Sequence, residues 1–354
     1  METEDLLQMP HVAVVILSWN GKSFLEKFLP SVCQSTYPSL DIYVADNAST
    51  DDTLTYIKEN FRNIKTIHLK RNEGFARGYN LALQQIFSDY AILLNQDVEV
   101  TPGWIEPLVE MMQSDPSIAA CQPKIKSFHD KSAFEHAGAA GGYIDVFGYP
   151  FCRGRLFSTV EKDTGQYEQV HEVFWASGAA LCVRLELFKR FKGFDDMFFA
   201  HMEEIDLCWR WKRAGYKIMY VPEATVYHVG GGSLPKENPG KIYLNFRNNL
   251  FMIFKNFEFY ELLIKLPFRF FLLDFLAMCN ALRQKKWGEA GAIIRADISF
   301  LIALPVMFRK RVEGFVLFWK HRVDHSRVKA SGYYRQSIVW KYFVKNIRKF
   351  TELQ

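Results

Sequence analysis

Short apolar runs alternate with amphipathic segments over the first 125 residues, and this alternation limits the possible folds more than any other feature of the chain. One of the amphipathic segments is predicted to be a helix that begins after Ser49 or Thr50, because the carboxylates of Asp51 and Asp52 suit the positive end of a helix. Strands that alternate with helices predict an α/β fold, Rossmann-like, with a mostly parallel central sheet. The apolar runs span residues 11–18, 41–45, 64–69 and 90–94, and helical spacing marks 23–34, 75–87 and 102–113.

Beyond residue 125 the pattern is less regular. Residues 126–172 are rich in Gly and aromatic residues, which predicts loops and short strands over one edge of the sheet. Residues 174–183 and 216–221 predict two more strands. Residues 203–214 predict a helix that ends at Gly215.

Charge divides the chain into two unlike parts. Residues 241–354 carry 21 Lys and Arg against 8 Asp and Glu, whereas residues 1–240 carry 23 against 31. An acidic front part argues against a nucleic-acid-binding protein, and a basic, Phe-rich tail favours an anionic membrane surface as partner. We therefore expect a main domain over residues 1–240 and a basic amphipathic helical region over residues 241–354.

The tail is apolar without forming a clean membrane span. Charged residues interrupt both of its apolar stretches, so neither reaches about 20 uncharged residues. Helices that lie in the membrane interface fit this mixture, and a soluble helical subdomain or a dimer surface are the alternatives. The interruptions are Lys265, Arg269 and Asp274 in residues 260–278, and Arg295 and Asp297 in residues 291–308.

Cysteine usage indicates a reducing compartment. The six cysteines show no CxxC pairing, and the acidic start of the chain, residues 1–5, does not resemble a secretory leader. We expect a cytosolic protein with free thiols that behave as small buried hydrophobic residues.

Acidic residues stand at two places where a ligand could bind. Asp97 follows the apolar run of residues 90–94 after two amides, Asn95 and Gln96, which places it at the carboxyl edge of the predicted sheet. A second acidic cluster, residues 203–206, opens a predicted helix. One site that draws on both would use Asp97 toward a metal-bound diphosphate and the cluster toward the incoming nucleophile.

Three loops near the same edge carry polar or aromatic residues. Trp19 could stack on a nucleobase or be buried under a loop, and Asp46 could accept the imide N–H of uracil or thymine or form an Asx turn. Residues 71–80 combine two glycines with Asn and Arg at a helix start, which suits phosphate. This segment has neither P-loop nor GxGxxG spacing, which weakens a kinase or dehydrogenase interpretation.

Five motifs occur in an order that resembles the inverting family 2 glycosyltransferases, which have the GT-A fold. Their rhamnosyltransferase-like branch is the most similar, and the resemblance extends over residues 11–250. Residues 251–354 are similar only in being basic, apolar and helical. The motifs are VVILSWNG (14–21), DNASTD (46–51), NEGFARGYN (72–80), LLNQDV (93–98) and EEIDLCWR (203–210).

The resemblance implies roles in donor binding. Trp19, Asn20 and Asp46 would hold the nucleobase, and the donor sugar would lie over a strip of small residues that could equally be core. The remaining nucleotide pocket would be lined by Asn72, Gly74, Arg77, Asn80 and Gln96, and the sugar strip by Trp175, Ser177 and Gly178.

It also implies a divalent metal, Mg²⁺ or Mn²⁺. Asp97 matches the last acid of the family's DxD motif, while its first position is Asn95 here. One carboxylate with amide neighbours is a weaker set of ligands than two carboxylates. His228 matches a histidine that several relatives use at the metal, although a lone histidine is more often a structural hydrogen-bonding residue.

Inversion requires one base opposite the departing diphosphate. The family's base is the second acid of a Glu-Asp pair, which falls on Glu204, with Asp206 as the second candidate. Glu203 and Asp206 share a helix face, and Glu204 points about 100° away from Glu203, so the three are not expected to serve one role. An ordinary acidic helix start is the alternative.

The expected activity is transfer of a sugar, rhamnose among the candidates, from a dTDP- or UDP-linked donor to a glycan acceptor that can be lipid-linked, in cell-surface polysaccharide synthesis. The expected location is cytoplasmic and peripheral on the inner face of the cell membrane. One alternative is a sugar nucleotidyltransferase, which should carry a glycine-rich, basic signature that residues 18–21 lack. A non-catalytic sugar-nucleotide-binding protein is the other, because Asn95 and Glu204 depart from the family pattern.

Overall fold

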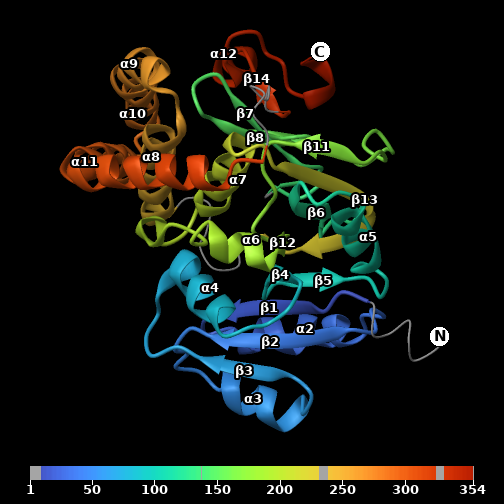
Figure 1. The fold of residues 1–354 in the computed structure, drawn as a ribbon. Helices are drawn as coiled ribbons and strands as arrows, with labels where there is room; N and C mark the ends of the chain where they lie inside the picture. The colour runs from blue at the N-terminus through green and yellow to red at the C-terminus, as the bar shows by residue number, and fades with distance from the viewer. Residues whose placement is uncertain (1–8, 137, 231–237, 324–330, 354) are drawn as a thin grey trace.

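The computed structural model describes residues 9–136, 138–230, 238–323 and 331–353 (Figure 1). The acidic start of the chain lies outside these residues. The main sheet has nine strands in the order β11-β13-β6-β12-β4-β1-β2-β3, with β5 paired to β13. Its strands are β1 (Val12–Ser18), β2 (Leu40–Asp46), β3 (Lys65–His68), β4 (Tyr90–Asn95), β5 (Val98–Val100), β6 (Ile118–Ser127), β11 (His171–Val173), β12 (Ala180–Arg184) and β13 (Lys217–His228).

Parallel pairing is confirmed where strands and helices alternate. β4, β1, β2 and β3 are parallel neighbours, and Ser18 pairs with Asp46 at their carboxyl ends. The β-branched residues of β1, such as Val12 and Val14, are fully buried because helices cover the sheet. Those helices are α2 (Lys22–Cys33), α3 (Thr53–Asn60), α4 (Gly74–Gln84) and α5 (Glu106–Ser114).

The other half of the sheet makes it mixed. β12 is antiparallel to both β4 and β6, while β6 and β13 are parallel to each other. Two successive reversals restore the direction, so β13 runs the same way as β1 and β4. The end of β13 and the start of β12 therefore lie at the edge where β1, β2 and β4 end.

A second sheet confirms the short strands predicted between residues 126 and 172. It has the order β10-β9-β8-β7-β14, and its last strand comes from the far end of the chain. Asp145, fully buried, accepts the backbone N–H of Ile338 at 2.9 Å, which anchors the returning segment. The elements are β7 (Gly142–Asp145), β8 (Pro150–Cys152), β9 (Arg155–Leu156), β10 (Thr159–Val160), β14 (Tyr333–Tyr334), α12 (Ile338–Phe343) and η3 (Phe350–Glu352).

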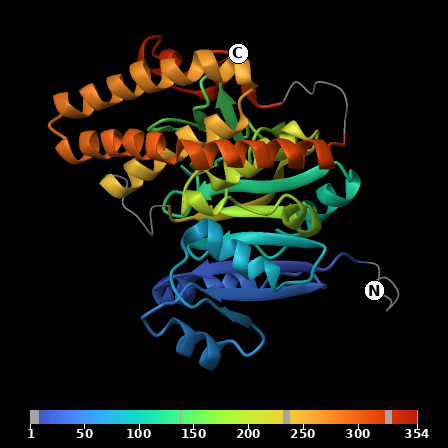
Figure 2. The ribbon, with the colours of Figure 1, turned by 60° about the vertical axis from the view of Figure 1, so that its left-hand side comes forward.

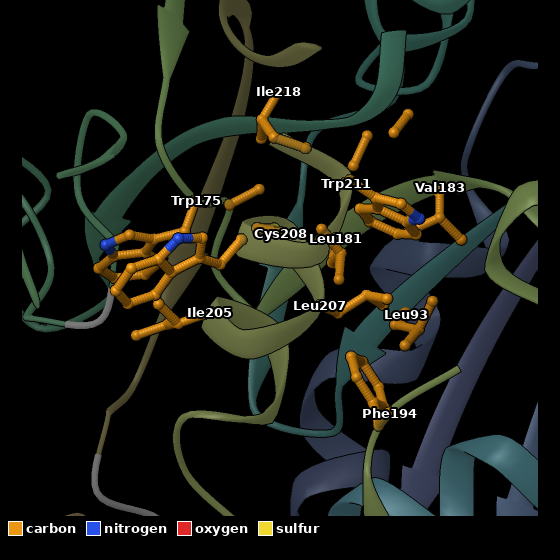
Figure 3. Packing of buried hydrophobic residues seen from close by; sticks show 14 of the residues in the cluster. Leu93, Trp175, Leu181, Val183, Phe194, Ile205, Leu207, Cys208, Trp211 and Ile218 are labelled. Carbon is orange, nitrogen blue, oxygen red and sulfur yellow. The ribbon is translucent and has the colours of Figure 1, made fainter. Parts of the chain in front are cut away.

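The predicted helix over residues 203–214 is α7 (Glu203–Arg213), which follows α6 (Leu185–Arg190) and η1 (Asp196–Phe198). Its apolar side packs on the main sheet, where Leu207, Cys208 and Trp211 lie beside strand residues that include Leu181 and Leu93 (Figure 3). These side chains are buried, and this packing sets which face of α7 remains available to the sheet edge.

Helices of the basic tail are in contact with the main domain. α8 packs against both α7 and α11. α10 and α11 lie side by side and form a helical hairpin that extends beyond the sheets (Figure 2). The division at residue 240 stays a prediction. The bounds are α8 (Pro239–Asn256), α9 (Phe259–Phe268), η2 (Arg269–Asp274), α10 (Phe275–Arg283) and α11 (Trp287–His321).

All six cysteines are free, but Cys33 is exposed and Cys279 is partly exposed, so the expected burial does not hold for these two. Cys121, Cys152, Cys182 and Cys208 are buried and behave as small core residues.

Candidate active site

The carboxyl edge of the main sheet gathers residues from four segments that are distant in sequence. Asp97 lies two residues beyond the end of β4, and His228 ends β13. The backbone N–H of Asn95 donates to the carbonyl of Ala179 at 3.0 Å, which places the residue before it, Gly178, at the same edge. The carboxyl group of Glu204 lies beside Gly178, since a Cβ added to that glycine would lie 3.9 Å from the carboxyl carbon of Glu204. Asp97 and Glu204 therefore lie at the same carboxyl edge of the main sheet.

Asp97 and His228 form a buried pair at this edge. Their Oδ1 and Nε2 atoms are 3.1 Å apart, and both side chains are almost fully buried. On the other side of the ring, Nδ1 of His228 is 3.2 Å from the carboxylate of Glu135. Burial lowers the pKa of His228, but the two carboxylates outweigh it and raise that pKa to about 10.

Once a bound cation displaces the Nε2 proton of His228, these residues fit a divalent ion in two respects. Two cis ligands of an octahedral ion with bonds of roughly 2.1 Å lie roughly 3 Å apart, close to the separation of Asp97 Oδ1 and His228 Nε2. A histidine ligand usually has a carboxylate or carbonyl at its second nitrogen, and Glu135 occupies that position. Among the described residues no group of three His, Cys, Asp or Glu forms a complete metal site, so phosphate and water would supply the other ligands.

Glu135 was not predicted. It lies in the glycine-rich segment that the sequence marked only as loops and short strands, where an acid has no periodic or motif signal. Gly230, with a φ of +71°, approaches Glu135 so closely that a Cβ there would lie 2.4 Å from its Oε1.

Trp19 and Asp46 lie at the carboxyl ends of the neighbouring strands β1 and β2. Trp19 is 49% exposed beyond the end of β1, so the alternative of a buried ring is not what the structure shows. Asp46 is buried at the end of β2, and its two oxygens accept only a long hydrogen bond, 3.3 Å each, from the backbone of Ser49 in the described contacts. The side chain of Asn20, unlike those of Trp19 and Asp46, is engaged in a short contact within the protein. Its amide oxygen accepts the backbone N–H of Thr50 at 2.7 Å.

Gly74 and Asn72 make contacts within the protein. Gly74 has a φ of +75°, and a Cβ there would lie 2.5 Å from the ring of Phe199. The close approach predicted for a ligand is thus made by the loop before α7. The amide oxygen of Asn72 accepts from the backbone of Gly74 at 2.9 Å and from Asn47 at 3.1 Å, which ties two loops together.

Asn80 and Arg77 also have partners inside the chain. The amide of Asn80 exchanges two hydrogen bonds of 2.9 Å with the backbone of Phe194 and donates to Asp196 at 2.7 Å. Its role in the structure is to join α4 to the loop before η1. Arg77 is partly exposed and lies 3.1 Å from Glu73 one turn earlier.

Gln96 lies at the ends of β4 and β1, whereas Trp175 and Ser177 of the predicted donor-sugar strip are buried. Gln96 accepts from the hydroxyl of Ser18 at 2.8 Å, which joins the ends of β4 and β1. Trp175 is core, since it is 4% exposed and its indole N–H donates to the carbonyl of Tyr143 at 2.8 Å. Ser177 is buried too, and its backbone N–H donates to Gln122 at 2.9 Å. Of the three, Gly178 is the one in contact with Glu204.

Glu204 has the environment of a base that works near neutral pH. Burial raises its pKa to about 7. Within the described residues its Oε2 is buried without a hydrogen-bond partner, as is Oε2 of Glu203. A buried carboxylate oxygen without a partner is costly, and at a sheet edge it indicates a polar ligand. Burial and the neighbouring Glu204 raise the pKa of Glu203 well above its ordinary value.

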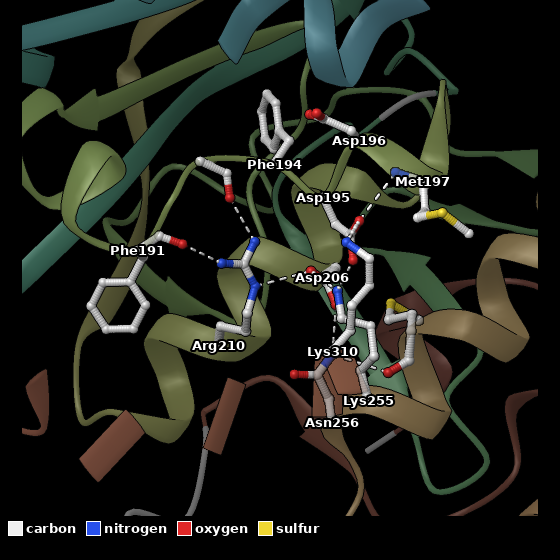
Figure 4. Close-up of polar contacts among 12 residues, drawn as sticks. Phe191, Phe194, Asp195, Asp196, Met197, Asp206, Arg210, Lys255, Asn256 and Lys310 are labelled. Atoms are coloured by element: carbon white, nitrogen blue, oxygen red, sulfur yellow. Dashed lines mark hydrogen bonds and ion pairs between the residues drawn. The ribbon is translucent and has the colours of Figure 1, made fainter. Parts of the chain in front are cut away.

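Asp206 belongs to a buried ionic network and not to the edge (Figure 4). It is fully buried, with Lys255 of α8 at 2.9 Å and Arg210 at 3.0 Å. Asn256 donates to its other oxygen at 2.8 Å. Lys255 also contacts Asp195 at 2.7 Å. Both oxygens of the Asp206 carboxylate already have partners, and two of these partners, Lys255 and Asn256, belong to α8. Its position therefore does not support a role as the alternative base.

Asp206→Ala should therefore destabilise the protein. Removing one partner of a buried ion pair costs up to roughly 3–5 kcal/mol, and here Lys255 would keep Asp195 as its only carboxylate while Arg210 would keep the carbonyls of Phe191 and Gly193. Chemical denaturation measures this loss. The matched control is Asp52→Ala, whose exposed partner Lys22 is 3.4 Å away and whose loss should leave the transition near that of wild type. An Asp206→Ala protein as stable as the control would contradict the structural role.

The fold is that of the GT-A class of glycosyltransferases. Residues 13–177 match the family model described as Glycosyl transferase family 2. The chain is thus a glycosyltransferase that carries a family 2 domain, and it is similar to relatives named as rhamnosyltransferases.

Two relatives illustrate the similarity. The N-acetylglucosaminyl-diphospho-decaprenol L-rhamnosyltransferase of Mycobacterium tuberculosis is 29% identical over 231 residues, which cover 61% of this chain and 75% of that protein. Rhamnosyltransferase WbbL of Escherichia coli K12 is 26% identical over 166 residues, covering 44% of this chain and 60% of that protein.

Solved structures support the fold. The mannosyltransferase PcManGT from Pyrobaculum calidifontis, in complex with GDP-Man and Mn²⁺, has a TM-score of 0.51 at 14% identity and covers 90% of this chain and 88% of its own. GalNAc-T7 with UDP, GalNAc and Mn²⁺ has a TM-score of 0.51 at 20% identity, over 62% of this chain and 43% of its own.

Proposed function

We propose that this protein transfers a sugar, with inversion, from a nucleoside-diphosphate donor to a glycan hydroxyl, using Glu204 as the base. The observation that carries the proposal is the contact between Glu204 and Gly178, which brings the buried carboxylate to the edge where Asp97 and His228 meet. A single base opposite one departing group is what an inverting transfer requires.

The donor side would be held by Asp97, His228, Asp46 and Trp19. A divalent ion bound by Asp97 and His228 would neutralise the charge that develops on the departing diphosphate. Asp46 would accept the imide N–H of uracil or thymine while the exposed ring of Trp19 stacks on the base.

The acceptor side would be served by Glu204. Its carboxylate takes the proton of the attacking hydroxyl as the new bond from oxygen to the anomeric carbon forms and the bond from that carbon to the diphosphate oxygen breaks. Burial keeps this carboxylate basic enough to accept a proton near pH 7.

For the donor we favour dTDP-rhamnose, with UDP-sugars as the alternative, and for the acceptor a lipid-linked glycan of cell-surface polysaccharide synthesis. The names of the relatives support rhamnose and a diphospho-decaprenol acceptor, and another relative is an O-antigen biosynthesis protein of Myxococcus xanthus.

The test is release of nucleoside diphosphate from a panel of dTDP- and UDP-sugars with Mg²⁺ or Mn²⁺ and short lipid-linked acceptors. We expect acceptor-dependent release from one donor. Binding of donors without release, across acceptors that related enzymes use, would instead indicate a sugar-nucleotide-binding protein.

We further propose that the helical hairpin lies on the cytoplasmic face of the membrane. Exposed apolar side chains follow both of its arms, among them Phe275 and Leu276 on α10 and Ile302 and Phe308 on α11. α11 is long and apolar enough to cross a membrane by length and composition, although Arg295 and Asp297 interrupt it as the sequence indicated. Its other face is held to the main domain, where Lys310 donates to Asp195 at 2.6 Å, which favours a helix lying along the surface.

Flotation of the full chain with phosphatidylglycerol vesicles should recover the protein, and neutral phosphatidylcholine vesicles should recover less of it at moderate salt. Ile302→Glu should reduce binding, because this side chain is 76% exposed on the hairpin. Phe87→Glu, 84% exposed on the main domain, is the matched control and should float like wild type. Equal recovery of the two variants would contradict the proposed surface.

A further inference from the structure

The loop that leads into α7 has an unusual backbone. Phe199 has φ 62° and ψ −62°, and the N–H of Ala200 donates to the carbonyl of Phe198 at 2.7 Å, which is a γ-turn of the rare positive-φ form. His201 and Met202 follow with φ of 71° and 74°. Residues with a Cβ seldom adopt these angles, so surrounding contacts must hold the loop in this conformation.

Asn248 of α8 supplies such contacts. Its side chain is fully buried, and its amide nitrogen donates to the carbonyls of Phe198, Ala200 and His201 at 2.9, 2.8 and 2.7 Å. An amide has two hydrogens, so one of them is shared between two of these acceptors. The three carbonyls span the whole strained segment.

Arg247 sets the orientation of that amide. Its guanidinium donates to the amide oxygen of Asn248 from Nε at 2.9 Å and from Nη2 at 2.8 Å, so the nitrogen must face the loop. Nη2 also donates to the carbonyls of Met197 and Phe198 at 3.0 and 3.2 Å. These charge-assisted bonds attach the loop to α8 at a further point.

The opposite side of the loop is fixed by α4. The carbonyl of Phe199 accepts the backbone N–H groups of Phe75 and Ala76 at 2.7 and 3.1 Å. The loop is thus held between α4 and α8, and it ends directly before Glu203 and Glu204. Any relaxation of the loop would move the first turn of α7, and with it the carboxylate that contacts Gly178.

We propose that Asn248, oriented by Arg247, is a positioning residue for Glu204: it holds the strained loop so that this carboxylate faces the sheet edge. The inference rests on the proposed function, because it assigns a role relative to the base of that reaction. Neither residue is placed at the reacting atoms.

Asn249 provides a matched control in the same helix. It is also buried, and its amide nitrogen donates to the carbonyl of Gly148 at 2.7 Å, in the turn between β7 and β8 and not in the loop before α7. Asn248→Ala and Asn249→Ala therefore remove the same group from equivalent burial, but they release different segments.

The experiment compares wild type, Asn248→Ala, Arg247→Ala and Asn249→Ala in acceptor-dependent release of nucleoside diphosphate, with melting temperatures for each. We expect Asn248→Ala to lower kcat by about 10²-fold with an unchanged KM for the donor, the size of effect that a displacement of about 1 Å can have. Asn249→Ala should melt earlier and retain its kcat. Arg247 is only partly buried, so Arg247→Ala should fold and lose kcat in the same direction, even if Asn248→Ala is unstable.

A kcat that falls equally in the Asn248 and Asn249 variants would overturn the inference, as would full kcat in Arg247→Ala. Either result would leave the proposed function intact, since wild-type turnover is measured in the same assay. Absence of wild-type turnover from every donor would instead remove the proposed function together with this inference.

Discussion

Glu204→Gln should lower turnover by roughly 10²–10⁴-fold and leave donor binding unchanged. The amide keeps the size of the side chain and cannot take the acceptor's proton. Rates of nucleoside diphosphate release and donor titration measure the two quantities separately. Glu223→Gln, the same exchange at an exposed position on β13, is the control and should have the wild-type rate.

The same residue should control the acidic limb of the pH profile. Glu204 must be ionised to act as a base, and burial raises its pKa to about 7. The wild-type rate should therefore be low well below pH 7, rise through that value and level off above it. This limb should be absent from the residual rate of Glu204→Gln, and its persistence there would assign the titration to another group.

Asp97→Ala should abolish metal-stimulated turnover and weaken donor binding. The exchange removes one of the two proposed protein ligands and leaves His228 with Glu135 and the amide of Asn95 as side-chain partners. Titration with Mn²⁺, followed by its electron paramagnetic resonance signal, should show loss of the tight site in the variant and its retention in Glu204→Gln.

The contrast between the two variants is the sharper test. Asp97→Ala should reduce donor binding, whereas Glu204→Gln should not, because the first acts on the diphosphate and the second on the acceptor. Equal losses of donor binding in both would contradict the division of roles at this edge.

Sequence patterns predicted the half of the fold in which each strand is followed by a helix. The parallel order of β1, β2, β3 and β4 follows from that alternation. The antiparallel β12 and the return of β14 to β7 were not visible, because pairing between distant strands leaves no periodic trace in either strand.

The candidate site was predicted to a similar extent. Asp46, Asp97 and His228 were located as side chains at strand ends, since such positions can be read from where an apolar run stops. Asn80, Gly74 and Trp175 were assigned to ligands, and the structure gives them partners within the chain. A motif shows that a polar or small residue is needed but not what it contacts.

By itself, the sequence determined that Trp19, Asp46 and Asp97 follow strands that end at one edge of the sheet, because the carboxyl ends of parallel strands must lie together. Only the tertiary structure showed that Asp206 differs from Glu204, because α8 packs against α7 so that Lys255 and Asn256 contact the Asp206 carboxylate. It also brought Glu135 to His228 and Asn248 to the loop before α7. Side-chain partners of this kind depend on how whole elements pack, and packing is a property of the folded chain that local sequence does not contain.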